Sequence, residues 1–236
     1  MKGSTRREFL RNSGSLGALA LVGSAMVPTA AWADPMGLPV GIQLYTVRGV
    51  IETDTPGTLK QLHDIGYREV ETAGFGKYTA KEFGQLIKDA GLSCPSAHLQ
   101  LNGPEYGQVF DDAHALGVTY ATSSTLSAWA PKPQASKFHG WPKLGLDDFK
   151  RLAAKMNDVG TKAKAAGLQY AYHNHDVEFQ KMPDGSYGYD VLLNETDHGL
   201  VKFEIDCGWM VVGGASPVEY MKKHPGRFRM IHVKDF

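Results

Sequence analysis

The segment KAAGLQYAYHNH, residues 164–175, joins the end of an amphipathic helix to a β-rich strand through a single glycine, Gly167. In this position glycine ends a helix because it adopts the left-handed conformation without strain. Short connections from helix to strand are typical of parallel sheets, in which a crossover helix follows each strand. Three further segments have the same order of elements: HDIGYREVETAG (63–74), KDAGLSCPSAHL (88–99) and HALGVTYATSS (114–124).

Three more stretches are expected to be strands of the same sheet: VGIQLYTV (40–47), VKFEIDCGW (201–209) and RMIHVKDF (229–236). The sequence thus predicts seven parallel strands, near residues 42, 69, 96, 120, 171, 204 and 231. Their regular alternation with helices favours an α/β fold of the (β/α)8 TIM-barrel type over an open sheet. No G-x-G-x-x-G segment follows the first strand, which argues against a dinucleotide-binding sheet.

The first 33 residues have the three parts of an export signal. Arg6-Arg7 and Phe9-Leu10 precede an apolar stretch over 16–27, and Ala31-Trp32-Ala33 offers a cleavage site. The paired arginines indicate the twin-arginine route and a periplasmic or secreted protein. We therefore expect two parts, a signal over 1–33 and a TIM barrel over 34–236.

Composition limits the partners of the exported chain. The 236 residues hold 25 basic and 25 acidic side chains, and 42% of them are hydrophobic, as in a globular protein. Without the signal, 21 basic residues remain against 24 acidic ones, which argues against nucleic acid as a partner. No apolar run has the roughly 18 residues of a membrane span, so no membrane partner is expected after signal removal. Assembly into a homo-oligomer stays open.

Polar residues gather at the predicted strand ends, where TIM barrels carry their chemistry. Side chains alternate along a strand, so His173 shares a face with His175, Glu204 with Asp206, and His232 with Lys234. Imidazole together with carboxylate suits a divalent ion such as zinc, manganese or cobalt. Such an ion polarises a carbonyl and stabilises an enediolate. The candidates in chain order are Gln43, Tyr45, Glu71, His98, His173, His175, Glu178, Glu204, Asp206, His232 and Lys234.

Six segments resemble the xylose-isomerase-like TIM-barrel family of sugar phosphate isomerases/epimerases. They are GIQLYTVR (41–48), VETAGF (70–75), SAHL (96–99), YHNHDVEF (172–179), FEIDCGW (203–209) and IHVKDF (231–236). The likeness runs over about residues 38–236, and its specific parts are the segments of strands 5, 6 and 7. The YHNHDVEF form is similar to a secreted branch of the family that acts on sugars or keto-sugars.

The resemblance implies a divalent metal (Mn, Zn, Co or Mg) held by side chains of strands 5 to 8. The family's strand 6 Asp matches Asp206, and its strand 7 His matches His232. Strand 5 usually supplies Glu, whereas this chain has His173-Asn174-His175 there. The ligand from strand 5 is therefore His173, His175 or Glu178, and we take His173 with Asp206 and His232 as the expected set.

The family also has an eighth strand, whose Glu completes the metal site and often acts as acid or base. The chain ends at Phe236, directly after the seventh predicted strand, and we expect it to be a fragment or an early-terminated form, with a partial barrel completed by a partner chain as the alternative. A seven-stranded barrel would leave two unpaired edges.

The remaining candidates have alternative roles. Glu178 and His175 are expected as acid or base, and Lys234 either contacts a substrate oxygen or forms an ion pair with Glu204, which itself is expected to be structural. Trp209 either stacks on a sugar or caps the core. A proline- and aromatic-rich loop over 124–145 either covers the substrate or lies on the surface. Gln43, Tyr45, Glu71 and His98 complete the expected substrate pocket.

These expectations favour a metal-dependent sugar isomerase or epimerase that works through an enediolate, with a small carbohydrate as its substrate. A lyase or hydrolase acting on keto-glycosides, or an exported barrel that binds carbohydrate without catalysis, remains as the alternative. Phosphodiester hydrolysis, as in the related endonuclease IV group, disagrees with export and with the acidic balance of the mature chain.

Overall fold

The computed structural model describes residues 39–103, 105–124 and 144–235. The export signal expected over 1–33 and most of the loop expected over 124–145 lie outside these residues. None of the described helices is long and apolar enough to cross a membrane.

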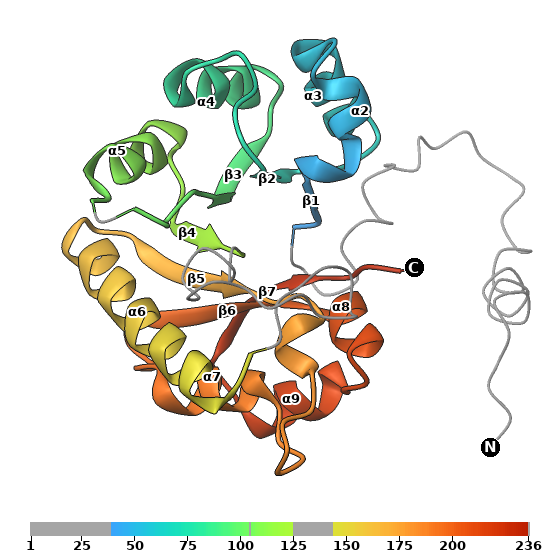
Figure 1. Ribbon diagram of the computed structural model, residues 1–236. Helices are drawn as coiled ribbons and strands as arrows, with labels where there is room; N and C mark the ends of the chain where they lie inside the picture. Colours follow the sequence, from blue (N-terminus) through green and yellow to red (C-terminus); the bar gives the residue numbers. More distant parts are fainter. Residues whose placement is uncertain (1–38, 104, 125–143, 236) are drawn as a thin grey trace, which may run out of the picture.

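Seven parallel strands form one curled sheet in chain order (Figure 1). They are β1 (Gly41–Gln43), β2 (Glu69–Thr72), β3 (Ser93–His98), β4 (Tyr120–Ser123), β5 (Gln169–His173), β6 (Val201–Asp206) and β7 (Phe228–His232). The predicted strands and the TIM-barrel class are thus confirmed. Within the described residues the sheet runs from β1 at one edge to β7 at the other, and these two strands are not paired with each other.

Helices surround the outside of the curled sheet (Figure 1). The longer ones are α3 (Thr55–Asp64), α4 (Ala80–Asp89), α5 (Gly107–Leu116), α6 (Leu146–Ala165), α7 (Gly188–Glu195) and α9 (Pro217–Lys223). Short helical turns follow three strands: η2 (Leu44–Val47) with α2 (Arg48–Ile51), η3 (Val177–Phe179) and α8 (Cys207–Val212).

The helix-to-strand connections are those that the four repeated segments predict. Gly66, Gly91, Gly117 and Gly167 each have positive φ, between 77° and 116°. A side chain at these positions would strain the backbone, which explains why glycine recurs in every segment.

Three strands are shorter than the sequence predicts, and one of them, expected over 229–236, ends at His232. The expected strand over 40–47 keeps only Gly41–Gln43, because the chain turns into η2 at Leu44. The strand expected over 201–209 ends at Asp206, whose carboxylate accepts a hydrogen bond from the Trp209 N–H at 2.8 Å and caps α8. An Asp at this position satisfies an unpaired N–H group of the helix and so favours a helical turn over a longer strand.

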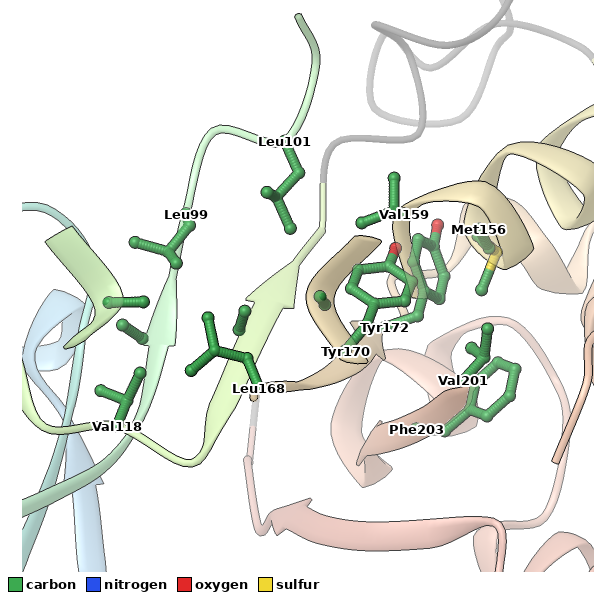
Figure 2. Packing of buried hydrophobic residues seen from close by; sticks show 14 of the residues in the cluster. Leu99, Leu101, Val118, Met156, Val159, Leu168, Tyr170, Tyr172, Val201 and Phe203 are labelled. Atoms are coloured by element: carbon green, nitrogen blue, oxygen red, sulfur yellow. The ribbon is translucent and has the colours of Figure 1, made fainter. Parts of the chain in front are cut away.

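Alternation along β5 and β6 separates an apolar outer layer from a polar interior. Tyr170, Tyr172 and Phe203 are fully buried and belong to the same cluster as Met156 and Val159 of α6 (Figure 2). The intervening side chains face the axis of the barrel, among them His173 and Glu204, which hydrogen-bond each other. The aromatic layer therefore fixes the sheet under α6 while the opposite face carries the polar groups.

We predict that Gly160→Ala destabilises the protein although alanine favours helices. A Cβ at this position of α6 would lie 2.7 Å from the Leu200 carbonyl oxygen, a backbone atom. Relief of this contact costs about 1–3 kcal/mol and outweighs a helix-propensity gain of about 1 kcal/mol. Thermal unfolding should show a lower melting temperature than for the wild type.

Gly107→Ala is the matched control, because a Cβ there meets nothing within 4 Å. Its melting temperature should stay the same or rise. Equal effects of the two substitutions would contradict the proposed close contact between α6 and the chain before β6.

Candidate metal and substrate site

Four side chains that could hold a metal ion meet inside the barrel. His98, His173, Glu204 and His232 each offer a ligand atom, and these atoms lie within 4.8 Å of one another. They come from β3, β5, β6 and β7, and each stands at the carboxyl-terminal part of its strand. The curled sheet thus brings together residues that are far apart in the sequence, as the strand-end pattern predicts.

Glu204 lies at the centre of this group. Its Oε2 accepts hydrogen bonds from His173 Nδ1 at 2.8 Å and from His98 Nε2 at 3.0 Å, and the residue is 2% exposed. Burial alone would raise the pKa of Glu204, but the hydrogen bonds from His173, His232 and His98 outweigh it and hold the pKa well below its usual range. The sequence analysis predicts only a structural role for Glu204. Its position on the same face as Asp206 was the signal that it enters the interior of the barrel.

Glu71 of β2 connects the far side of the barrel to the same group. Its Oε2 accepts hydrogen bonds from His232 Nε2 at 2.9 Å and from Gln43 Nε2 at 3.0 Å, and its Oε1 accepts one from Ser96 Oγ at 2.6 Å. Burial opposes ionisation, yet the positive charge of His98 and the hydrogen bonds from His232 and His98 lower the pKa of Glu71. The contact with His232 spans 161 residues of sequence and joins β2 to β7.

His98 lies between the two glutamates and balances their charge. Its Nε2 is 3.0 Å from Glu204 Oε2 and 3.3 Å from Glu71 Oε2. Burial alone would lower the pKa of His98, but the two carboxylates raise it to about 9. His98 is therefore an imidazolium at neutral pH, which allows two carboxylates to stay ionised in the same buried space.

One carboxylate oxygen in the site lacks a hydrogen bond. Asp206 Oδ2 is buried and has no hydrogen-bond partner among the described residues. It lies 3.8 Å from His173 Nε2 and 3.8 Å from His232 Nδ1, while the other nitrogen of each ring meets Glu204 or Glu71. Ligands bind zinc at about 2 Å, so two ligand atoms around one ion stand roughly 3–4 Å apart. The separation of each nitrogen from Asp206 Oδ2 lies in this range.

A pocket of about 1350 Å³ opens over these residues. On its rim, Lys234 Nζ stands 4.6 Å above the centre of the Trp209 ring. The His175 ring lies 5.6 Å from the ring of Trp209 and 5.1 Å from that of His173. The pocket continues along the space between β1 and β7, where Val40, Ile42 and Ile231 line it.

The structure brings most of the predicted site residues to this pocket. Gln43, His98, His173, His175, Asp206, Trp209, His232 and Lys234 line it, and Glu71 lies directly beneath. Tyr45 also lines it, but from the turn η2 rather than from a strand, with 57% of its surface exposed.

Glu178 is not brought to the pocket. It is fully buried, its Oε1 accepts a hydrogen bond from Tyr172 Oη at 2.6 Å, and its Oε2 accepts one from the His175 backbone N–H at 3.0 Å. Tyr172 projects from the face of β5 opposite to His173, so Glu178 belongs to the outer layer. Alternation could not predict this placement, because the chain leaves the strand after His173 and turns through η3.

Known proteins share both sequence and fold with this chain, although no family model matches it. Inosose dehydratase of Lacticaseibacillus casei is 30% identical over 182 residues, which cover 76% of this chain and 55% of that protein. The chain spans between about a third and about half of the length of the curated relatives that it matches, with 32% for the protein of Clostridium perfringens.

A sugar phosphate isomerase/epimerase from Parabacteroides distasonis has the same fold, with a TM-score of 0.69 and 29% identity over 83% of this chain and 74% of that one. Other solved structures with this fold are described as xylose isomerase-like TIM barrels. The chain has their fold. These relatives are named as enzymes of carbohydrates and related compounds, in line with the resemblance seen in the sequence.

We predict that Glu178 makes stability fall with rising pH. Burial raises the pKa of Glu178 to about 8, whereas an unfolded chain would have the ordinary value of 4.5. The stabilising proton is fully held below about pH 4.5 and is lost as the pH rises through about 8, so its contribution, on the order of a few kcal/mol, disappears over this window.

Glu178→Gln should remove this part of the pH dependence, because an amide keeps an oxygen for the His175 N–H and offers an N–H to Tyr172 Oη. Denaturant unfolding from pH 5 to 9 measures the difference from wild type, with exposed Glu195→Gln as the control. Parallel profiles for wild type and Glu178→Gln would show that Glu178 is ionised in the folded protein.

Proposed function

We propose that this protein is a metal-dependent enzyme that removes a proton next to the carbonyl of a keto-sugar or a keto-polyol. The observation that carries the proposal is the convergence of Asp206 Oδ2, His173 Nε2 and His232 Nδ1 at the floor of the pocket. A buried carboxylate oxygen without a partner is costly, and a cation would satisfy it.

The donor set also indicates which ion is suited. Two imidazoles and one carboxylate favour Zn²⁺, Mn²⁺ or Co²⁺ over Mg²⁺, which prefers oxygen ligands and retains its waters. When bound, such an ion supplies electrophilic polarisation of a carbonyl and an adjacent hydroxyl.

The chain's own residues supply the proton transfer and the orientation. His175 lies on the rim beside His173. Burial lowers the pKa of His175 to about 3, so its ring is neutral, and it is the group proposed to accept a proton from a carbon of the substrate. Lys234 offers N–H donors for a substrate oxygen, and the Trp209 ring forms the wall next to both groups.

Two outcomes follow from the same proton removal. If the proton returns to another carbon, or to the other face of the same carbon, the reaction is an isomerisation or an epimerisation, as the name of the P. distasonis protein describes. If a hydroxyl on the next carbon leaves as water, with a proton from the protein, the reaction is a dehydration. The 182-residue match to an inosose dehydratase favours dehydration as the second candidate.

The test is hydrogen exchange at the substrate carbon. The protein is stripped of metal with a chelator and incubated in D2O with a panel of ketohexoses and keto-inositols. We expect deuterium next to the carbonyl only after addition of Zn²⁺, Mn²⁺ or Co²⁺, and NMR of the product distinguishes isomerisation from loss of water.

Asp206→Asn should lower this exchange by about 100-fold or more, because the amide removes the ligand charge between the two histidines. Asp111→Asn, an exposed residue on α5, is the matched control and should exchange as the wild type does. Sugar binding that persists after chelation, without any exchange under metal, would instead support the non-catalytic carbohydrate-binding barrel.

We also propose that the enzyme acts outside the cytoplasm, on the basis of the twin-arginine pattern over 1–33. Protein recovered from the periplasm of an expressing bacterium should begin at Asp34 on N-terminal sequencing. Recovery of the uncleaved chain from the cytoplasm alone would contradict this location.

A further inference from the structure

The two histidines next to Asp206 each stand between two carboxylates. His173 has Glu204 at one nitrogen and Asp206 at the other, and His232 has Glu71 and Asp206 in the same way. A neutral His173 has a single N–H, so only one of its two carboxylates can receive it. Which carboxylate receives it decides whether the remaining nitrogen can bind a cation.

For His173 the distances decide the question. Its Nδ1 is 2.8 Å from Glu204 Oε2, within hydrogen-bond range, whereas its Nε2 is 3.8 Å from Asp206 Oδ2, outside that range. The ring is buried, with 4% of its surface exposed, and Glu204 is the only one of these two carboxylates within hydrogen-bond range of it. The hydrogen bond therefore puts the proton on Nδ1.

We propose that Glu204 is a positioning residue that holds His173 in the tautomer with the proton on Nδ1, so that the Nε2 lone pair faces Asp206. This inference rests on the metal site proposed above, but it concerns a residue outside the set Asp206, His173 and His232. Glu204 acts through His173 and needs no contact with the metal or the substrate.

Strand register makes this arrangement rigid. His173 and Glu204 are directly paired residues of β5 and β6, and Asp206 and His232 are directly paired residues of β6 and β7. Glu204 is held further by His98, whose Nε2 donates to the same Oε2 at 3.0 Å. The acceptor for the His173 proton is thus fixed by the backbone ladder and by a second donor.

Glu71 has the corresponding position toward His232. The His232 Nε2 donates to Glu71 Oε2 at 2.9 Å, which directs Nδ1 to Asp206 Oδ2. Glu71 reaches this ring from β2, across the interior of the barrel. Both rings therefore turn one nitrogen to a buried glutamate and the other to the same aspartate oxygen.

Without an acceptor at position 204, two of the atoms proposed to bind the cation would hydrogen-bond each other instead. The His173 proton would move to Nε2, and the ring would donate it to Asp206 Oδ2, which has no other partner among the described residues. The oxygen and the nitrogen that face the cation site would then bind each other. Loss of such a partner to a metal-binding histidine typically costs about 10–100-fold in metal affinity.

The experiment compares Glu204→Leu with Glu204→Gln. Leucine has no acceptor, whereas the glutamine oxygen can still accept from Nδ1. Nitrogen-15 NMR of the apo protein reports the tautomer of His173, assigned by the signals that disappear in His173→Gln. Zn²⁺ affinity is measured by competition with a chromophoric chelator, and Glu69→Gln, on the same strand as Glu71, is the control.

We expect the Nδ1–H tautomer in the wild type and in Glu204→Gln, and the Nε2–H tautomer in Glu204→Leu. Zn²⁺ affinity should fall about 10–100-fold in Glu204→Leu, and by less in Glu204→Gln. Glu69→Gln should bind as the wild type does. If Glu204 served stability alone, Glu204→Leu would lower the melting temperature but leave the His173 proton on Nδ1.

An Nε2–H tautomer of His173 in the wild-type protein would overturn the proposal, and this result needs no variant that folds. Wild-type Zn²⁺ affinity in a folded Glu204→Leu would overturn it as well. A wild type with the Nδ1–H tautomer that binds metal but exchanges no substrate proton would support the positioning role and contradict the proposed function, so the two failures are distinguishable.

Discussion

The register between β5, β6 and β7 is the constraint on which the site depends. It places His173 opposite Glu204 and Asp206 opposite His232, so that two pairs of functional side chains meet on the inner face. Because side chains alternate, a slip of one residue would turn all four toward the helices. The buried aromatic residues on the outer face of β5 and β6 oppose a slip of these two strands, since they would have to enter the polar interior.

The polar interior is the second consequence of this register. Glu71 and Glu204 are both buried, and contacts with His98, His173 and His232 lower the pKa of these carboxylates enough to keep them ionised. A barrel filled with aliphatic side chains would be more stable, but it could not hold two histidines in fixed orientations. Asp206 Oδ2 is the one buried carboxylate oxygen of this group that the network leaves without a partner among the described residues, and it marks the site.

The relatives point to one kind of chemistry with several products. Isomerisation, epimerisation and dehydration of a carbonyl compound all begin with removal of a proton next to the carbonyl, and proteins named for these reactions share this fold. Under the proposed function, the floor of the pocket serves the common step, and residues on its rim, such as His175, Trp209 and Lys234, decide which product forms.

The sequence by itself determined the fold and most of the residues that line the pocket. Helix-ending glycines and β-rich runs identified seven strands, and alternation placed the His and carboxylate residues on the inner face, because both signals are local. Only the tertiary structure decided that Glu178 lies in the outer layer and that Glu204 lies at the centre. Alternation holds only inside a strand, so it says nothing about Glu178, which follows the turn after β5. The partners of Glu204 and Glu71 come from strands distant in sequence, and their contacts exist only once the sheet has curled.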